Sequence, residues 1–270
     1  MKYLLSINFR FFSVEPIQLV SLSKTYGDCD GFEISFNVFD EIEKNYVSKF
    51  IKEIKKENMI VNFHANSSLS LDKQKVYLDY IYSQTFDYQE KVSIVYHSIY
   101  DEDTKRSINL SHIFFKNIIS YIKEKNYANL IISIENLNIL NQKRRLVKED
   151  FTSLLKNDDL MFTYDIGHEL IDECNYNTKF LPMNKILKQK IFNIHIHTFK
   201  DLQDHCPILE DCIYKNYFKN FYENLKKINY DNFIVLEYGL FAFEPFCDTV
   251  FKQCIEYAKC IKILKNIFNN

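Results

Sequence analysis

Two kinds of segment alternate along the whole chain, and they differ in how hydrophobic and polar residues are spaced. The first kind is short, apolar and rich in β-branched residues, and such segments start roughly thirty residues apart. Runs of this length and composition are typical of buried β-strands. The sequence predicts eight of them, at residues 2–8, 31–37, 59–65, 92–98, 130–136, 161–167, 192–198 and 233–239.

The second kind of segment is longer and places apolar residues at intervals of three and four, with lysine and glutamate between them. This spacing puts the apolar residues on one face of an amphipathic helix. Asp40 and Ser70 stand at the start of two such runs and fit helix N-caps. The clearest examples of these predicted helices are residues 39–58, 110–126 and 214–230.

The alternation of strands and helices predicts the fold class. Strands separated by helices pair in parallel, and eight such units in 270 residues predict a (β/α)8 TIM barrel of the α/β class. The competing interpretation is a doubly wound open sheet, which normally has a glycine-rich turn after its first strand. The segment INFRFFSVEP has no glycine there. Because no linker or low-complexity segment divides the chain, we expect a single domain over residues 1–270.

Composition argues against several other classes of protein. A formal net charge of -2 does not fit a protein that coats nucleic acid, which carries a basic surplus. No apolar run reaches the length of a membrane span, and the N-terminal MKYLLSINFRFF is interpreted as a strand and not as a signal peptide. The seven cysteines form no CxxC pair, which is typical of reduced thiols. We therefore expect a cytoplasmic protein with no membrane partner.

Residues able to bind metal ions gather at the ends of the predicted strands. In a barrel of this type the active site is built at the C-terminal ends of the strands. Five of the seven histidines lie at these ends, and a sixth, His205, lies in the loop after the seventh strand. The strand-end residues are His64, His97, Glu135, Asp165, His168, His195, His197 and Glu237.

Each of these residues alone has a structural explanation, such as a hydrogen bond or a helix cap, but the set as a whole does not. Three carboxylates crowded at one rim repel one another and lose hydration unless a positive charge lies among them. A divalent cation provides that charge. Histidine and carboxylate ligands together suit zinc, manganese, iron or cobalt better than magnesium or calcium. The sequence therefore predicts a metal site at this rim.

Strand by strand, the chain resembles the xylose isomerase-like TIM barrels. This superfamily includes sugar isomerases and epimerases as well as the endonuclease IV type of AP endonuclease (family 2). The motifs SIENLN, TYDIGH, NIHIHT and VLEYG, one from each of the last four predicted strands, carry the resemblance. The resemblance implies a core metal ion bound by four side chains, Glu135, Asp165, His195 and Glu237.

The remaining histidines resemble the endonuclease branch, which uses three zinc ions. The resemblance implies a second ion bound by His64, His97 and Glu135, with Glu135 bridging it to the core ion. It implies a third ion bound by His168, His205 and a loop aspartate, for which Asp204 is the first candidate. We therefore expect one to three divalent ions per chain, with zinc as the first choice.

The loop after the seventh strand departs from the endonuclease branch, where Asp-x-His is usual. In QDHCPILED, Asp204 and His205 are adjacent and Gln203 stands where the aspartate is expected, so Asp201, Asp204 and His197 all remain candidates for this ligand. The glycine-containing loops that grip DNA in that branch have no counterpart in NFRFFSVEP or ENLN. These departures and the slightly acidic charge argue against duplex DNA as the substrate.

Three functions fit this site. The first is a multinuclear hydrolase of a small phosphodiester or phosphate ester, in which Glu135 bridges ions and Glu237 holds an ion or orients the attacking water. The second is a mononuclear sugar or sugar-phosphate isomerase or epimerase, in which the same two glutamates shuttle a proton. The third is a barrel that binds metal without catalysis. We favour the hydrolase, because an isomerase has no evident need for His64, His97 and His205 together.

Three further residues are expected to contact the substrate. His197 shares a strand face with His195 but lies one pair further out. We place it at the mouth of the site, where it contacts substrate or completes an outer metal site. Lys200 and Arg10 are the candidates for binding a phosphate group. The sequence leaves the oligomeric state and the identity of the substrate open.

Overall fold

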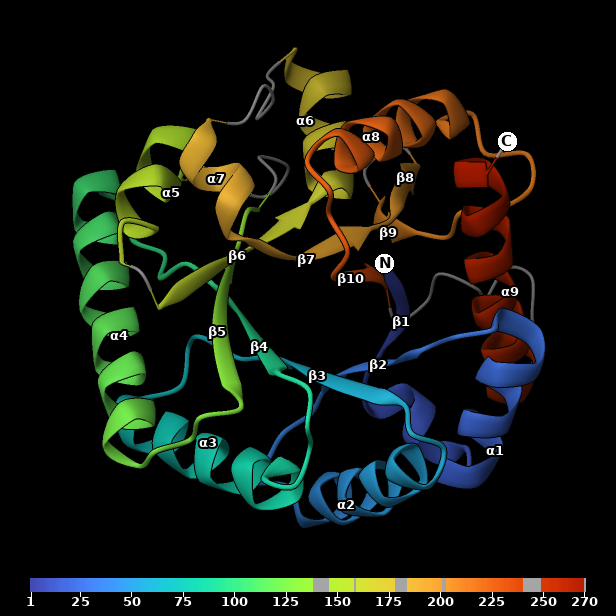
Figure 1. The fold of residues 1–270 in the computed structure, drawn as a ribbon, viewed down its shortest axis with the longest axis horizontal. Helices are drawn as coiled ribbons and strands as arrows, with labels where there is room; N and C mark the ends of the chain where they lie inside the picture. The colour runs from blue at the N-terminus through green and yellow to red at the C-terminus, as the bar shows by residue number, and fades with distance from the viewer. Residues whose placement is uncertain (138–145, 158, 178–183, 201–202, 240–248, 270) are drawn as a thin grey trace.

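The chain folds into a closed (β/α)8 barrel (Figure 1). A computed structural model describes residues 1–137, 146–157, 159–177, 184–200, 203–239 and 249–269. Its eight parallel strands neighbour one another in the order β1-β10-β7-β6-β5-β4-β3-β2. The first strand pairs with both the second and the last strand of the barrel, which closes it. The predicted TIM barrel is therefore confirmed, and the open sheet is excluded.

Every predicted strand segment coincides with a strand of the barrel. These strands are β1 (Lys2–Ile7), β2 (Gly31–Ser35), β3 (Ile60–Ala65), β4 (Val92–His97), β5 (Leu130–Glu135), β6 (Leu160–Asp165), β7 (Ile191–Ile196) and β10 (Phe233–Leu236). A short antiparallel hairpin, β8 (Thr198–Lys200) with β9 (Gln203–Cys206), follows β7 where the sequence analysis expected only a loop. This hairpin lies outside the barrel sheet.

Helices surround the barrel in Figure 1. They are α1 (Pro16–Leu22), α2 (Glu41–Lys56), α3 (Leu71–Thr85), α4 (Thr104–Glu124), α5 (Lys148–Leu154), α6 (Ile166–Tyr176), α7 (Lys185–Lys190), α8 (Lys215–Lys227) and α9 (Val250–Asn269), with single helical turns η1 (Phe9–Ser13) and η2 (Ser23–Gly27). Asp40 caps α2 as predicted, because its carboxylate accepts the N–H groups of Ile42 and Glu43 at 2.9 and 3.1 Å. Ser70 precedes α3, but its side chain makes no capping hydrogen bond.

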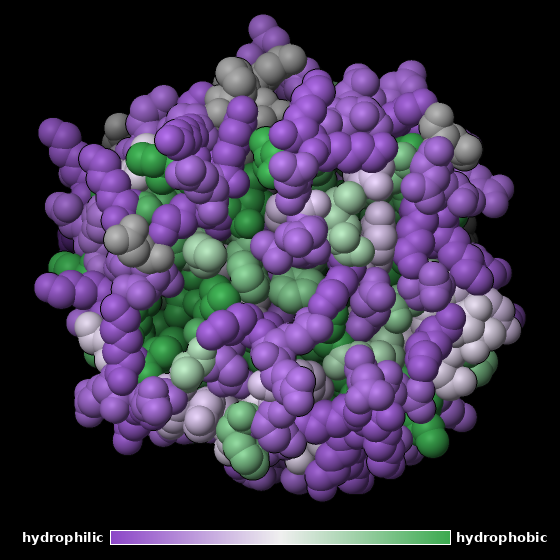
Figure 2. All heavy atoms as spheres, viewed as in Figure 1, coloured by the Kyte–Doolittle hydropathy of each residue, from purple (hydrophilic) through white to green (hydrophobic). Residues whose placement is uncertain are grey.

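The main hydrophobic core lies between the outside of the barrel and the inner faces of the helices. Helix α2 is an example, because its buried residues Val47, Phe50, Ile51 and Ile54 follow the predicted three- and four-residue spacing. Phe50 meets Phe32 of β2 edge to face, with ring centroids 4.8 Å apart. Figure 2 shows the complementary outer surface, which is largely hydrophilic on the side in view.

The inside of the barrel changes in character from one end of the strands to the other. Alternate residues of a strand share a face, so each strand contributes a short series to the interior. Three such series are Ile60, Asn62 and His64 in β3; Ile131, Ser133 and Glu135 in β5; and Met161, Thr163 and Asp165 in β6. The interior is therefore apolar near the N-terminal ends of the strands, polar in the middle and ionisable at the C-terminal rim.

The middle layer is a buried hydrogen-bond network centred on Asn193. Its amide donates to Ser93 Oγ at 2.6 Å and to Thr163 Oγ1 at 3.1 Å. Its carbonyl oxygen accepts from Asn62 at 3.4 Å. Since buried polar groups are costly unless paired, this network explains why an amide stands behind the two histidines in the FNIHIH segment. It fixes the floor beneath the rim.

Candidate metal centre

Four side chains from three adjacent strands and the end of a fourth converge at the C-terminal rim. Glu135 ends β5, Asp165 ends β6, His195 lies in β7 and Glu237 follows β10. One potential ligand atom from each of the four lies within 4.8 Å of the others. His195 Nδ1 is 2.8 Å from Glu237 Oε2 and 3.3 Å from Glu135 Oε2. The structure thus brings the predicted core set together at one point.

A second group lies beside the core and shares Glu135 with it. His64 Nε2 is 3.0 Å and His97 Nε2 is 3.7 Å from the same oxygen, Glu135 Oε2. The two imidazole rings meet edge to face, with centroids 4.9 Å apart. The side chain of His97 is 40% exposed and that of His64 is 12% exposed, whereas Glu135 is buried. This group therefore lies on the solvent side of the centre.

A third group forms between the first turn of α6, the residue that follows β7 and strand β9. Asp165, His168, His197 and His205 each offer a potential ligand atom within 4.8 Å of the others. Asp204 lies against three of these rings, at 3.5 Å from His168 Nε2, 3.2 Å from His197 Nδ1 and 3.3 Å from His205 Nδ1. The predicted outer residues are therefore neighbours in space.

Asn136, directly after β5, connects the core group to the outer group. Its side chain donates to Asp165 O at 2.9 Å and accepts from Asp165 N at 2.8 Å. Its own carbonyl oxygen is 2.8 Å from His168 Nδ1. The Asp165 carboxylate in turn accepts the His168 backbone N–H at 2.8 Å and caps α6. These bonds hold the ends of β5 and β6 and the first turn of α6 in one arrangement.

The buried polar atoms of the rim are suited to a cation. Several buried atoms among them make no hydrogen bond of acceptable geometry with the described residues, although each lies within 3.6 Å of a carboxylate or imidazole neighbour: Glu33 Oε1, Glu135 Oε1, Asp165 Oδ2, His195 Nδ1, His197 Nε2 and Glu237 Oε2. Leaving such groups unpaired away from water is costly. A divalent ion that accepts imidazole and carboxylate donors would satisfy them together. The residues present therefore fit the predicted metal.

The histidines nearest the carboxylates hold protons strongly. Burial disfavours the charged form of His64, but the hydrogen bond to Glu135 and its negative charge outweigh burial and raise the pKa of His64 to about 9. Burial likewise opposes protonation of His168, yet the charge of Asp165 and the hydrogen bond with Asp204 raise its pKa to about 10. A metal ion that binds these imidazoles must displace the protons.

Two other histidines of the rim behave in the opposite way. Burial lowers the pKa of His97 to about 4, against the opposing charge of Glu135. Burial and the neighbouring His197 lower the pKa of His205. Burial would raise the pKa of Glu237, but the charge of His195 outweighs it and the pKa falls below its ordinary value. His97 and His205 thus offer neutral imidazoles and Glu237 an ionised carboxylate, which are the forms that bind metals.

Comparison with solved structures identifies the fold. No family model and no curated protein sequence matches the chain. The structure is similar to 3-keto-D-glucoside 4-epimerase from E. coli, with 15% identity, a TM-score of 0.68 and coverage of 98% of this chain and 99% of that one. It is similar to the IolI protein with a bound zinc atom, with 13% identity, a TM-score of 0.62 and coverage of 100% of this chain and 98% of that one. Endonuclease IV from Thermus thermophilus also matches, with 12% identity, a TM-score of 0.54 and coverage of 95% and 99%.

These solved structures are xylose isomerase-like TIM barrels, and the chain shares their fold. The predicted resemblance is therefore confirmed at the level of the fold. Neighbours with this fold include epimerases and an endonuclease, so the fold leaves the choice between isomerase and hydrolase open. None of the described helices of this barrel is long and apolar enough to cross a membrane.

The sequence pattern did not identify one buried carboxylate of the site, Glu33. Glu33 lies inside the barrel in the middle of β2, and it is completely buried. Its two carboxylate oxygens are 3.1 and 3.2 Å from His195 Nε2, the ring nitrogen opposite the one that faces Glu135 and Glu237. The signal in the sequence was an acidic residue between Phe32 and Ile34 in an apolar strand.

The predicted substrate contacts have different outcomes. His197 is completely buried, so its expected position at the mouth of the site is wrong, and the outer metal group is the alternative that its surroundings favour. Lys200 is exposed at the end of β8 and borders a separate cavity of about 420 Å³ behind the hairpin. Arg10 is partly buried in η1, just after β1. Asp201 lies outside the described residues.

Proposed function

We propose that this chain is a metal-dependent hydrolase of a small phosphodiester or phosphate ester, with more than one ion at the rim. The observation that carries the proposal is the position of Glu135 between two ligand groups. Its Oε2 is 3.0 Å from His64 Nε2 and 3.3 Å from His195 Nδ1. A carboxylate shared in this way is suited to bridging two ions. Bound ions would polarise phosphate oxygens and lower the pKa of a water to near neutral.

The exposed edge of the centre indicates where a substrate would enter. His97, at 40% exposure, is the most accessible of the clustered histidines, and Glu237 is 17% exposed. A substrate approaching from solvent would meet His97 before the buried Glu135. Glu237, ionised because of His195, can accept a proton from the attacking water or hold it in line. His64 and His97 would orient the group that occupies the space above Glu135.

Zinc is the ion that the donor set supports first, with manganese, iron or cobalt as alternatives. Imidazole nitrogens and carboxylate oxygens are the ligands that zinc takes outside thiolate sites. The IolI protein, which has the same fold, is described with a bound zinc atom. The overlapping ligand groups of the rim would accommodate one to three ions per chain. The proposed ligands are His64, His97, Glu135, Asp165, His168, His195, His205 and Glu237.

A small molecule is the substrate class that we favour. The net charge of -2 gives no basic surplus for a long polyanion, although endonuclease IV shares the fold. Lys200 and Arg10 remain candidates for a single phosphate group. The proposed substrate is therefore a nucleotide-like or other small phosphate ester and not duplex DNA.

A sugar or sugar-phosphate epimerase is the second candidate, and a specific observation favours it. The TM-score with 3-keto-D-glucoside 4-epimerase is 0.68, against 0.54 with endonuclease IV. In this alternative Glu135 and Glu237, which approach one point from different strands, would move a proton between the two faces of a sugar carbon. A non-catalytic metal-binding barrel is the third possibility.

Parallel assays on one zinc-loaded preparation test the proposal. One arm measures hydrolysis of bis(p-nitrophenyl) phosphate and of small nucleotide esters. The other arm follows deuterium incorporation into ketoses and ketose phosphates in heavy water, because epimerisation exchanges a carbon-bound proton. We expect metal-dependent hydrolysis without exchange. Exchange and turnover of a sugar without phosphodiester hydrolysis would overturn the first candidate in favour of the second. Inactivity in both arms, with zinc and after replacement of zinc by manganese, iron or cobalt, would favour the metal-binding barrel without catalysis.

A further inference from the structure

His197 is an imidazole that neither the core group nor the His64 group uses. It follows β7 and is completely buried, with its ring centroid 5.1 Å from that of His168 and 4.2 Å from that of His205. A side chain at Gly167, in the first turn of α6, would collide with its ring. The absence of a side chain at this position therefore lets α6 pack directly against the imidazole.

Hydrogen bonding assigns the protonated nitrogen of this ring. His197 Nδ1 faces two acceptors, Thr198 O at 3.1 Å and Asp204 Oδ1 at 3.2 Å. Because neither can donate, we place a proton on Nδ1, and Nε2 is the nitrogen that a metal ion would bind in place of any proton shared with Asp165. His168 has the same arrangement, since its Nδ1 faces Asn136 O at 2.8 Å and Asp165 Oδ2 at 3.2 Å. Fixing one ring nitrogen in this way is how proteins aim the other at a metal.

The free nitrogen of His197 faces a carboxylate at the separation of two metal ligands. Its Nε2 is buried without a hydrogen-bond partner among the described residues and lies 3.2 Å from Asp165 Oδ1. Two ligands bound to one tetrahedral zinc at about 2.0–2.1 Å lie about 3.3 Å apart. The 3.2 Å separation of this pair matches that spacing, and it also lets the two atoms share a proton when no ion is bound.

His205 is turned toward the same point by an unusual backbone conformation. Its φ angle is 54°, in the left-handed region that non-glycine residues rarely adopt. Its carbonyl oxygen accepts the N–H of Gly239 at 2.9 Å, and its own N–H donates to Asp204 Oδ1 at 2.6 Å. Backbone strain of this kind is retained mainly at functional sites.

We propose that the outer metal site is built from three histidines and one carboxylate, His168, His197, His205 and Asp165, with His197 as the ligand that the loop aspartate was expected to supply. Asp204 is then a positioning residue that holds the rings of the site and the backbone of His205. A nitrogen-rich set of this kind selects zinc or another imidazole-preferring transition ion over magnesium or calcium. The inference rests on the proposed metal dependence and deepens it.

The test counts bound zinc in the full chain without using catalysis. Protein is stripped with chelator, reloaded with zinc, dialysed and analysed by elemental analysis, and affinities are measured against a chromophoric chelator. His197→Asn and His205→Asn should each lose one ion relative to the unsubstituted protein. Asparagine tolerates the φ angle of His205, so this second variant keeps the fold even where the first disturbs packing. Far-UV circular dichroism checks that both variants are folded.

A double variant and two controls decide the assignment. His197→Asn combined with His205→Asn should lose no more than one ion, because both ligands serve the same one. Asp204→Asn should keep the ion count and weaken zinc binding by about 10- to 100-fold, as expected of a positioning residue. His112→Asn, on the exposed face of α4, should change neither the zinc count nor the zinc affinity.

Three results would overturn the proposal. One is an unchanged zinc count and affinity in His197→Asn. Another is loss of the ion in Asp204→Asn with retention in His197→Asn. The third is an unsubstituted protein that holds only the core ion. None of these depends on turnover, so failure of the hydrolase assay with the expected zinc counts would refute the proposed function alone.

Discussion

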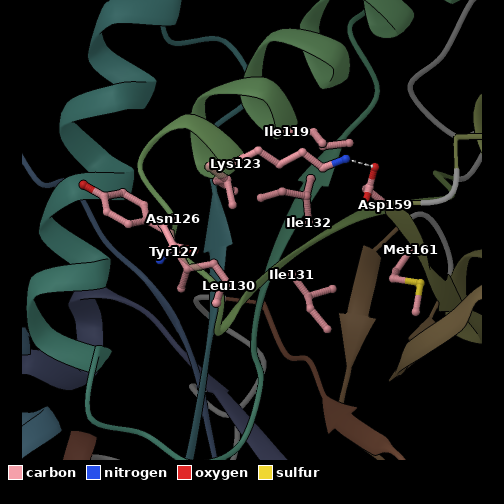
Figure 3. A pocket seen from close by; sticks show the side chains of 11 residues that line it. Ile119, Lys123, Asn126, Tyr127, Leu130, Ile131, Ile132, Asp159 and Met161 are labelled. Carbon is pink, nitrogen blue, oxygen red and sulfur yellow. Dashed lines mark hydrogen bonds and ion pairs between the residues drawn. The ribbon is translucent and has the colours of Figure 1, made fainter.

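Charged side chains are paired differently at the two ends of the barrel. At the N-terminal ends of β5 and β6, a groove of about 400 Å³ lies beside α4 (Figure 3). Its walls are mainly apolar, with Ile119, Ile131 and Met161 among them, and Lys123 forms an ion pair with Asp159 at 2.5 Å. Figure 2 shows hydrophobic atoms left of the centre, where Figure 1 has α4 and β5.

Among the described residues of the C-terminal rim, lysine–carboxylate pairs of this kind do not balance the charge. The clustered carboxylates Glu33, Glu135, Asp165 and Glu237 face histidines, whose positive charge depends on pH. Several of their buried atoms have no hydrogen-bond partner among the described residues. The groove is therefore electrostatically complete as it stands, whereas the rim needs protons or cations.

Removing a core carboxylate should have the largest effect. Glu237→Ala takes away an anionic ligand and leaves the core group undercharged. We expect the core ion to be lost and activity to fall by orders of magnitude. Elemental analysis and the assays described above measure both. Glu256→Ala, on the partly exposed side of α9, is the matched control and should leave both unchanged. Full metal content in Glu237→Ala would refute the assignment.

Removing a histidine beside the core should have a smaller and more local effect. His64→Ala and His97→Ala should each remove about one ion and leave the core ion bound, because Glu135 keeps its contacts to the core group. Phosphoesterase activity should still fall steeply, since the ion that shares Glu135 is gone. If the unsubstituted protein holds one ion and these variants keep it, the site is mononuclear. That result would favour the epimerase alternative.

The sequence could predict the barrel and its rim because both depend on local pattern. The period-two spacing of β3, β5, β6 and β7 places each strand-end ligand on the inner face, so convergence follows from the fold alone. The sequence pattern did not reveal Glu33 as a site residue, because it lies in mid-strand and because its partner, His195, is 162 residues away in the chain. Only the closed barrel brings the two together.

Two other features depended on packing that no local pattern reveals. His197 was expected at the mouth because it follows His195 by two, yet the approach of α6 at Gly167 buries it. The hairpin of β8 and β9 consists of strands of three and four residues, too short for a periodic signal. This hairpin places Asp204 and His205 against the outer group.

The pH dependence of stability should differ between the stripped and the metal-loaded protein. A histidine whose folded pKa lies above its unfolded value of about 6.5 stabilises the fold fully below that pH. This contribution falls as pH rises toward the folded pKa values, about 9 for His64 and about 10 for His168. We therefore expect the melting temperature of stripped protein to fall between pH of about 6.5 and 10.

Zinc-loaded protein should resist this loss, because the ion and not a proton balances the carboxylates. Calorimetric melting curves of both forms at three pH values across that window make the comparison. His64→Gln, which cannot be protonated, should flatten part of the decline in the stripped form. Parallel pH profiles for stripped and loaded protein would contradict the interpretation of the rim as charge-incomplete.

Glu33→Gln should weaken the core site without destroying it. The glutamate faces His195 Nε2, so it orients the ring and leaves Nδ1 for the core group. Glutamine keeps the volume and can still accept from Nε2, but it loses the charge. We expect core zinc affinity to fall by about 10- to 100-fold, with the ion count restored at high zinc concentration. Unchanged affinity in competition with a chelator would show that Glu33 does not act on the ion through His195.

Changes at the opposite end of the barrel should have the smallest effect. Lys123 and Asp159 are paired, but their side chains are 62% and 46% exposed, so water and salt screen the interaction. A double-mutant cycle with Lys123→Ala and Asp159→Ala should therefore give a coupling free energy below about 1 kcal/mol, and less at high salt. Zinc content should stay at the level of the unsubstituted protein in all three variants, because the apolar and hydrogen-bonded layers of the barrel interior separate the groove from the rim. Loss of zinc in Lys123→Ala would show that the two ends are coupled and that the rim does not balance its charge independently.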